Sequence, residues 1–133
     1  MKSLLLDTHI LLWYVNEPDL LSDKIKQAID TYDKVYVSAI SCFEINWLVR
    51  HNRIILPNGL NYTAWITRIQ QLTGIEFLNI TPEIASLSVE LPEHHKDPWD
   101  RLIIATVLIH DCYLASVDTK FPLYQELNNK LIN

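Results

Sequence analysis

Short apolar runs that alternate with helical segments are the feature that most constrains how this chain can fold. Four runs have the length and aliphatic character of buried strands, namely residues 2–6, 34–38, 75–80 and 113–117. Strands that alternate with helices favour a mostly parallel sheet, because each crossover helix returns the chain to the start of the next strand. The sequence therefore predicts an α/β fold, a three-layer α/β/α sandwich of the Rossmann-like kind with helices on both faces of the sheet.

The segments between these runs carry apolar side chains at helical spacing, and several begin with residues that cap helices. Thr81 and Asp97 each precede a proline, which suits the first position of a helix. We expect helices at about residues 8–15, 22–29, 40–51, 62–72, 82–91 and 99–110. The tail from Phe121 has no clear pattern, although residues 130–132 would suit a short last strand. No linker or repeat interrupts the chain, so residues 1–133 are expected to form a single domain.

Composition limits where the protein acts and what it binds. The formal net charge of −5 leaves no overall basic surface, so a nucleic-acid partner would have to bind a local basic patch or bound metal ions. Cys42 and Cys112 lie far apart and outside any Cys-x-x-Cys motif, which favours free thiols in a reducing compartment. No apolar run approaches the roughly 18 residues of a membrane span, and the N-terminal run does not resemble a signal peptide. We expect a cytoplasmic protein without a membrane partner.

Acidic residues follow or border these apolar runs. Asp7 follows the first run, Glu44 lies shortly beyond the second, Asp100 is near the start of the last helix, and Asp118 follows the last of the four runs. Ligands of parallel α/β sheets bind beyond the carboxyl ends of the strands, so we expect these carboxylates to converge. Clustered carboxylates repel one another unless a cation compensates, and Mg²⁺ or Mn²⁺ prefers oxygen ligands. The pattern indicates a metal-dependent hydrolase, although each acid taken alone also suits a helix cap, a turn or an exposed helix position.

The residues around these acids resemble a known family. The segments are 4–13 (LLLDTHILLW), 38–45 (SAISCFEI), 97–105 (DPWDRLIIA) and 114–118 (LASVD). In this order they resemble the four signature segments of PIN-domain nucleases, most closely those of the toxin-type subgroup of the VapC kind. The resemblance implies a PIN-like α/β/α sandwich, Mg²⁺- or Mn²⁺-dependent endoribonuclease activity and frequent homodimerisation. It also implies an RNA substrate and a small antitoxin protein that neutralises the enzyme.

The resemblance assigns roles by position in these segments. Core metal ligands and a fourth acid, which binds metal directly or through water, fall on Asp7, Glu44, Asp100 and Asp118. Hydroxyl groups that support the acids fall on Thr8 and Ser116. Asp97 is expected to cap the helix that carries Asp100, because Pro98 suits the first helical position. Two departures from the family pattern stand beside the acids: Trp99 replaces a phenylalanine, and Phe43 replaces a tryptophan.

Several basic and aromatic residues are candidates for contacts with partners. Adjacent histidines rarely bind one ion and no Cys₂His₂-type spacing is present, so we expect His94 and His95 to lie in a solvated loop near the site rather than in a zinc site. RNA phosphates are expected to contact Lys96, Arg101 and Lys120, although Arg101 suits an ion pair that orients an acid equally well. Aromatic residues of the two middle helices are expected to lie mostly in the core, and part of their surface would suit a dimer mate or an antitoxin: Trp47, Tyr62 and Trp65.

The function expected from the sequence is a metal-dependent endoribonuclease, the toxin of a toxin–antitoxin pair. One alternative is a PIN-fold module that binds RNA or a protein partner without turnover. Another is a phospho-acceptor domain or phosphatase, since these also place aspartate at strand ends. A dehalogenase-type phosphatase would need Asp-x-Asp after the first strand, whereas Asp7 is followed by Thr8 and His9.

Overall fold

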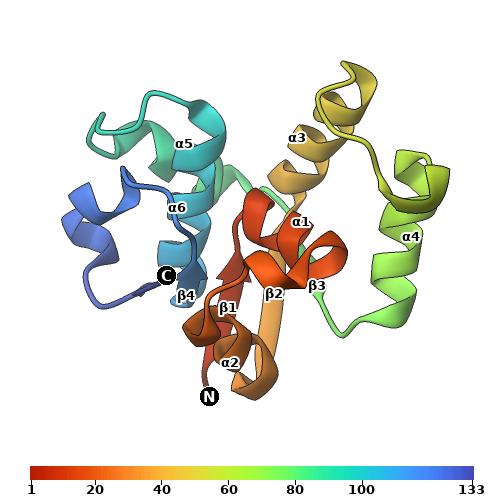
Figure 1. The fold of residues 1–133 in the computed structure, drawn as a ribbon. Coiled ribbons are helices and arrows are strands. Elements are labelled where there is room, and N and C mark those ends of the chain that lie inside the picture. The colour runs from red at the N-terminus through yellow and green to blue at the C-terminus, as the bar shows by residue number, and fades with distance from the viewer.

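The computed structural model describes residues 1–133 and contains a five-stranded sheet between helices (Figure 1). The strands are β1 (Ser3–Leu6), β2 (Lys34–Ser38), β3 (Glu76–Leu78), β4 (Tyr113–Ala115) and β5 (Leu131–Ile132). They are all parallel and follow the order β3-β2-β1-β4-β5, so β1 lies at the centre. The predicted α/β sandwich with a parallel sheet is confirmed.

The helices cover the two faces of this sheet. They are α1 (Thr8–Asn16), α2 (Asp23–Thr31), α3 (Ala39–Arg50), α4 (Tyr62–Leu72), α5 (Pro82–Glu90) and α6 (Pro98–His110). Short 3₁₀ turns at Pro18–Leu20, Pro57–Gly59, Phe121–Leu123 and Gln125–Leu127 complete the chain. In Figure 1, α5 and α6 lie together on one side of β1, whereas α3 and α4 extend on the other. No helix combines the length and apolar character that a membrane span requires.

The core divides at β1 because neighbouring side chains of a strand point to opposite faces. Leu4 and Leu6 pack into a buried cluster with residues of α1 to α4, including Trp65. Leu5 packs into a second cluster with α5, α6 and the turn that contains Phe121. The three leucines are fully buried, which explains why this strand reads as a continuous apolar run. Packing on both faces of the sheet therefore fixes the end of β1, from which the chain enters α1.

Most predicted boundaries agree with the structure to within a residue or two, and the main differences are in β4 and β3. The chain leaves β4 after Ala115 rather than at residue 117, because the Ser116 hydroxyl accepts a hydrogen bond from the Asp118 N–H and turns the chain. The helix α6 begins at Pro98, one residue before the expected range and at the position that the predicted Asp97 cap implies, and Asp97 accepts the Trp99 N–H. The strand β3 is only Glu76–Leu78 and thus shorter than the predicted 75–80.

The tail gains its order from long-range contacts that its sequence pattern does not show. The strand β5 pairs with β4, and the Ser116 N–H donates to the Ile132 carbonyl at 3.0 Å. Phe121 and Tyr124 are fully buried against α5 and α6. Both cysteines are free: Cys112 is buried and Cys42 is half-buried.

Candidate active site

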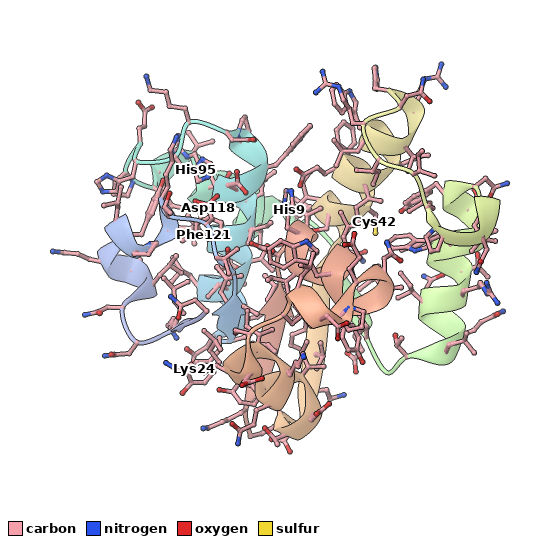
Figure 2. All side chains as sticks on the ribbon, in the orientation of Figure 1. His9, Lys24, Cys42, His95, Asp118 and Phe121 are labelled. Atoms are coloured by element: carbon pink, nitrogen blue, oxygen red, sulfur yellow. The ribbon has the colours of Figure 1, made fainter.

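A cleft of about 390 Å³ opens beyond the carboxyl end of the sheet. Its lining comes from the ends of β1 and β4 and from the helices α1, α3 and α6, and consists of Asp7, Thr8, His9, Trp13, Glu44, Asp97, Asp100, Val117 and Asp118. The cleft thus brings together all four acids that the sequence singled out. In Figure 2, the lining residue His9 lies near the centre of the molecule, with the lining residue Asp118 and the nearby His95 to one side.

Asp7 is the most buried acid of the cleft, with 8% of its surface exposed. It is the N-cap of α1, and its Oδ1 accepts the Ile10 N–H at 2.9 Å. Its Oδ2 accepts a short hydrogen bond from the Ser116 hydroxyl at the end of β4. Burial raises the pKa of Asp7 above its usual value, although these two hydrogen bonds oppose the rise. The cap and the candidate ligand are therefore the same side chain.

The two predicted supporting hydroxyls have different partners. Ser116 donates to Asp7 and accepts the Asp118 N–H at 3.1 Å, so it contacts one acid and positions the backbone of another. Thr8 is buried, but its hydroxyl donates to the Ser41 hydroxyl of α3 at 2.9 Å and forms no hydrogen bond with an acid. Thr8 thereby ties the start of α1 to the helix that carries Glu44.

Glu44 and Asp100 face the cleft from two helices that begin near it. Glu44 is half-buried on α3, next to the fully buried Ile45. Asp100 lies in the first turn of α6, which Asp97 caps. Burial, followed by the charges of nearby acids, raises the pKa of Asp100 to about 7, although His95 opposes this rise. A bound cation would stabilise the ionised form of such a crowded carboxylate.

Asp118 lies in the loop after β4 and is held from two directions. Its Oδ1 accepts the Lys120 backbone N–H at 2.7 Å, and its Oδ2 lies 3.1 Å from His95 Nε2. Burial alone would raise the pKa of Asp118, but the Lys120 N–H and His95 together lower it below its usual value. Asp118 therefore stays ionised more readily than Asp100.

The prediction of a solvated His94–His95 loop is wrong for His95. Only 8% of His95 is exposed, and its Nε2 lies 3.0 Å from Asp100 Oδ2 as well as 3.1 Å from Asp118 Oδ2. Its backbone N–H donates to the Tyr124 hydroxyl at 2.9 Å. His94, by contrast, is exposed. The only signal in the sequence was the short distance from His95 to the Asp97–Asp100 segment, because the residues that bury it come from the tail.

The three basic residues expected to contact RNA differ in their surroundings. Lys96 and Lys120 are exposed near the cleft. The guanidinium of Arg101 instead donates to three carbonyls at the end of α5, those of Ser88, Val89 and Leu91, at 2.8–3.0 Å. The Arg101 side chain forms no ion pair with an acid of the cleft, and it is largely shielded from solvent. This geometry gives Arg101 the role of joining α5 to α6, and it does not support a phosphate contact.

Exposed aromatic side chains lie beside the acids, between α3 and α6. Phe43, the neighbour of Glu44, is 54% exposed, and its ring centroid is 5.4 Å from that of Trp99, the neighbour of Asp100. Trp47 lies 6.3 Å from Trp99 by the same measure and is also exposed, in contrast to the expectation that it would be in the core. Helical spacing showed that Phe43 and Trp47 are close to one stripe of α3, but not that this stripe lacks a covering element.

The donor set fits a hard divalent cation. Four carboxylates from separate elements face one cleft, and oxygen ligands are those that Mg²⁺ and Mn²⁺ prefer. Donor atoms of Asp100, Asp118 and His95 lie within 4.8 Å of one another. The raised pKa values of Asp7 and Asp100 indicate carboxylates that are costly to ionise together, and a bound cation would reverse this cost.

The sequence and the fold are similar to those of known proteins. The chain is 36% identical over 121 residues to Ribonuclease VapC22 of Mycobacterium tuberculosis, and the match covers 90% of each chain. Two solved structures share the fold at lower identity. FitAcB from Neisseria gonorrhoeae is 22% identical with a TM-score of 0.68, covering 98% of this chain and 96% of that one. VapBC2 from Rickettsia felis, bound to a DNA fragment from its promoter, is 17% identical with a TM-score of 0.71, covering 98% of both chains.

A family model described as the PIN domain matches residues 4–127, which include every acid of the cleft. The match spans most of the chain, and the relative from Mycobacterium tuberculosis is similar over nearly the same length. The chain therefore belongs to the PIN-domain family.

Proposed function

We propose that this protein is a metal-dependent endoribonuclease, the cytoplasmic toxin of a toxin–antitoxin pair. The observation that carries the proposal is the convergence of four carboxylates from four separate elements in one cleft, in a chain 36% identical to a ribonuclease. The alternative of a dehalogenase-type phosphatase has no support in the site, because the position two residues after Asp7 is the exposed His9.

In the proposed mechanism, Asp7, Glu44, Asp100 and Asp118 hold Mg²⁺ or Mn²⁺. When bound, the metal would lower the pKa of a coordinated water and stabilise the oxygen that leaves the phosphorus. The chain supplies the frame for this chemistry. Ser116 and the Ile10 N–H orient the Asp7 carboxylate, and the Lys120 N–H orients that of Asp118. A fixed frame reduces the reorganisation needed during the reaction.

The surroundings of the cleft support an RNA strand with unpaired bases as the substrate. Lys96 and Lys120 are exposed near the cleft and would contact phosphates of the RNA strand. Phe43 and Trp99 present aromatic surface directly beside Glu44 and Asp100, and unpaired bases stack on such surfaces whatever their sequence. The proposed RNA contacts thus combine two local lysines with aromatic surface, in a chain whose net charge is negative.

The proposed partners are a small antitoxin and a second copy of this chain. The support is the likeness to a structure described as a toxin–antitoxin complex from Klebsiella pneumoniae, which shows the fold and leaves the partners as part of the proposal. The gene of a small DNA-binding or disordered protein is expected beside the gene of this chain. Co-expression of the two should yield a complex that elutes together and cleaves RNA more slowly than the free toxin.

The activity is tested with purified protein and a panel of single-stranded and structured RNAs. We expect cleavage with Mg²⁺ or Mn²⁺, none with a chelator, and none from the Asp7→Asn variant. Lack of metal-stimulated cleavage across the panel would contradict the proposal. RNA binding that persists without metal and is unchanged in Asp100→Asn, again without cleavage, would favour the binding module instead.

A further inference from the structure

A buried histidine contacts two of the four acids in the cleft. His95 Nε2 forms a hydrogen bond with Asp118 Oδ2 at 3.1 Å and lies 3.0 Å from Asp100 Oδ2. The two carboxylates belong to separate elements, the first turn of α6 and the loop after β4. Figure 2 shows His95 above Asp118, on the same side of the cleft. His95 is thus the side chain through which these two acids are joined.

Buried aromatic residues from the tail hold His95 in place. The backbone N–H of His95 donates to the hydroxyl of Tyr124, and the centroid of the imidazole ring lies 5.7 Å from that of the Phe121 ring. Tyr124 and Phe121 are themselves fully buried. A side chain placed by buried neighbours has few other rotamers available, so its Nε2 is fixed relative to the cleft.

The two ring nitrogens indicate what His95 does there. An ionised carboxylate offers only acceptors, so a proton on Nε2 best satisfies the contact with Asp118. The other nitrogen, Nδ1, is buried and has no hydrogen-bond partner. A histidine that ligates a metal almost always donates its second N–H to a carboxylate, carbonyl or water. Because Nδ1 lacks such an acceptor, the geometry favours a donor to the acids over a metal ligand.

We propose that His95 is a positioning residue that holds the carboxylates of Asp100 and Asp118 at the spacing that binds the divalent cation. It does so through the Nε2–H group, which offsets the repulsion between two acids that the fold brings together from different elements. This inference rests on the proposed function in taking the cleft to be a cation site. It assigns to His95 a role that does not require contact with the cation or with RNA.

The test measures Mn²⁺ affinity by calorimetry on the untagged, full chain and on three variants. Glutamine places an amide N–H at nearly the reach of Nε2, whereas leucine keeps much of the bulk and has no donor. We expect His95→Leu to weaken Mn²⁺ binding about tenfold or more, the scale typical of groups that support metal ligands, and His95→Gln to restore most of the loss. His94→Gln, at the exposed neighbouring position, should match wild type. Unchanged binding by His95→Leu, or equal losses in His95→Leu and His95→Gln, would overturn the proposal.

A second measurement needs no stable leucine variant. Pulsed electron paramagnetic resonance of Mn²⁺-bound protein detects ¹⁴N coupling from a directly bound imidazole. We expect wild type and His95→Gln to give the same ¹⁴N signal, because His95 does not bind the cation. A coupling that does disappear in His95→Gln would make His95 a ligand and overturn the positioning role. If wild type binds no Mn²⁺ at all, the proposed function fails together with this inference. If wild type binds Mn²⁺ and cleaves RNA but His95→Leu binds equally well, only the inference fails.

Discussion

The two sides of the cleft are organised by different means. On the inner side, where β1 and β4 end, each carboxylate oxygen of Asp7 accepts a hydrogen bond, one from the Ile10 N–H and one from Ser116. On the outer side, Asp100 is crowded by other acids and contacts only the imidazole of His95 among the groups that could offset its charge. Secondary structure thus completes the inner side, whereas the outer side depends on one loop side chain and, in our proposal, on a cation.

The largest expected effect comes from removing the charge on the inner side while the hydrogen bond that caps α1 remains. In Asp7→Asn the amide oxygen can still accept the Ile10 N–H, so the cap of α1 is retained. RNA cleavage should nevertheless fall at least about 100-fold, because a lost metal ligand removes several kcal/mol of transition-state stabilisation. Cleavage rates together with thermal unfolding check this. A large loss of thermal stability would show that Asp7 matters mainly as a cap.

On the outer side, the crowding of Asp100 should make the free energy of unfolding depend on pH when no metal is bound. Asp100 has a pKa of about 7 in the folded protein against 3.8 as the reference value, so the folded state binds the proton more tightly. Its contribution to the free energy of unfolding is therefore fully present below about pH 4 and is lost as the pH rises through 7. A shift of one pKa unit corresponds to about 1.4 kcal/mol, so the shift of Asp100 changes the free energy of unfolding by at most about 4 kcal/mol.

Asp100→Asn removes this titration and should be more stable than wild type at pH 8 in chelator, by about 2 kcal/mol. Denaturant unfolding from pH 4 to 8 measures the difference, with the exposed Asp30→Asn as a control. Saturating Mn²⁺ should reverse the order at pH 8, because only wild type retains the full ligand set. Parallel pH profiles for wild type and Asp100→Asn would show that the outer side is not strained by charge.

A smaller effect is expected from Ser116→Ala, which removes the hydroxyl that connects both sides. The variant leaves Asp7 Oδ2 and the Asp118 N–H without their shared partner, at a cost of about 1–2 kcal/mol in the free energy of unfolding. Cleavage should fall more than this stability loss explains, by about tenfold. Ser88→Ala, which removes a buried hydroxyl of α5 that bonds only to the Ala85 carbonyl, is the matched control. Equal activity of the two variants would contradict the role of Ser116.

The smallest effect is expected at the exposed rim. Lys96→Gln and Lys120→Gln should each raise KM for RNA about two- to threefold, and each should reduce the slope of log affinity against log salt by about 1. Lys24→Gln, which Figure 2 places at the opposite end of the molecule, should leave both quantities unchanged. Identical salt slopes for all three variants would remove these lysines from the RNA path.

The inner side could be predicted from sequence because its residues are defined by local patterns. Three leucines before Asp7 mark a buried strand, and an acid directly after such a strand must lie at the carboxyl edge of the sheet. On the outer side, the cap at Asp97 and the placement of Asp100 in the first turn follow from Pro98 in the same way. These positions need only the strand and helix to be identified, not their packing.

The missed features all depend on contacts between distant segments. His95 is buried because Phe121 and Tyr124 fold over it from a tail of 3₁₀ turns, which have no periodic pattern to detect. Arg101 donates to carbonyls at the end of α5, and carbonyls leave no trace in a sequence. Phe43 is exposed because no element covers that stripe of α3, and an absent neighbour cannot be read from helical spacing.

The hydrogen bond between Ser116 and Asp7 joins residues 109 positions apart, and this has a consequence for the order of synthesis. Asp7 leaves the ribosome well before its partner, which emerges only after β2, α3 and α6 have been made. The central strand β1 likewise lacks its β4 neighbour until then. A nascent chain therefore carries its first acid without the group that orients it. The RNA cleavage that we propose would begin only once the segment that carries Ser116 is also free of the exit tunnel, which delays any damage to the message being translated.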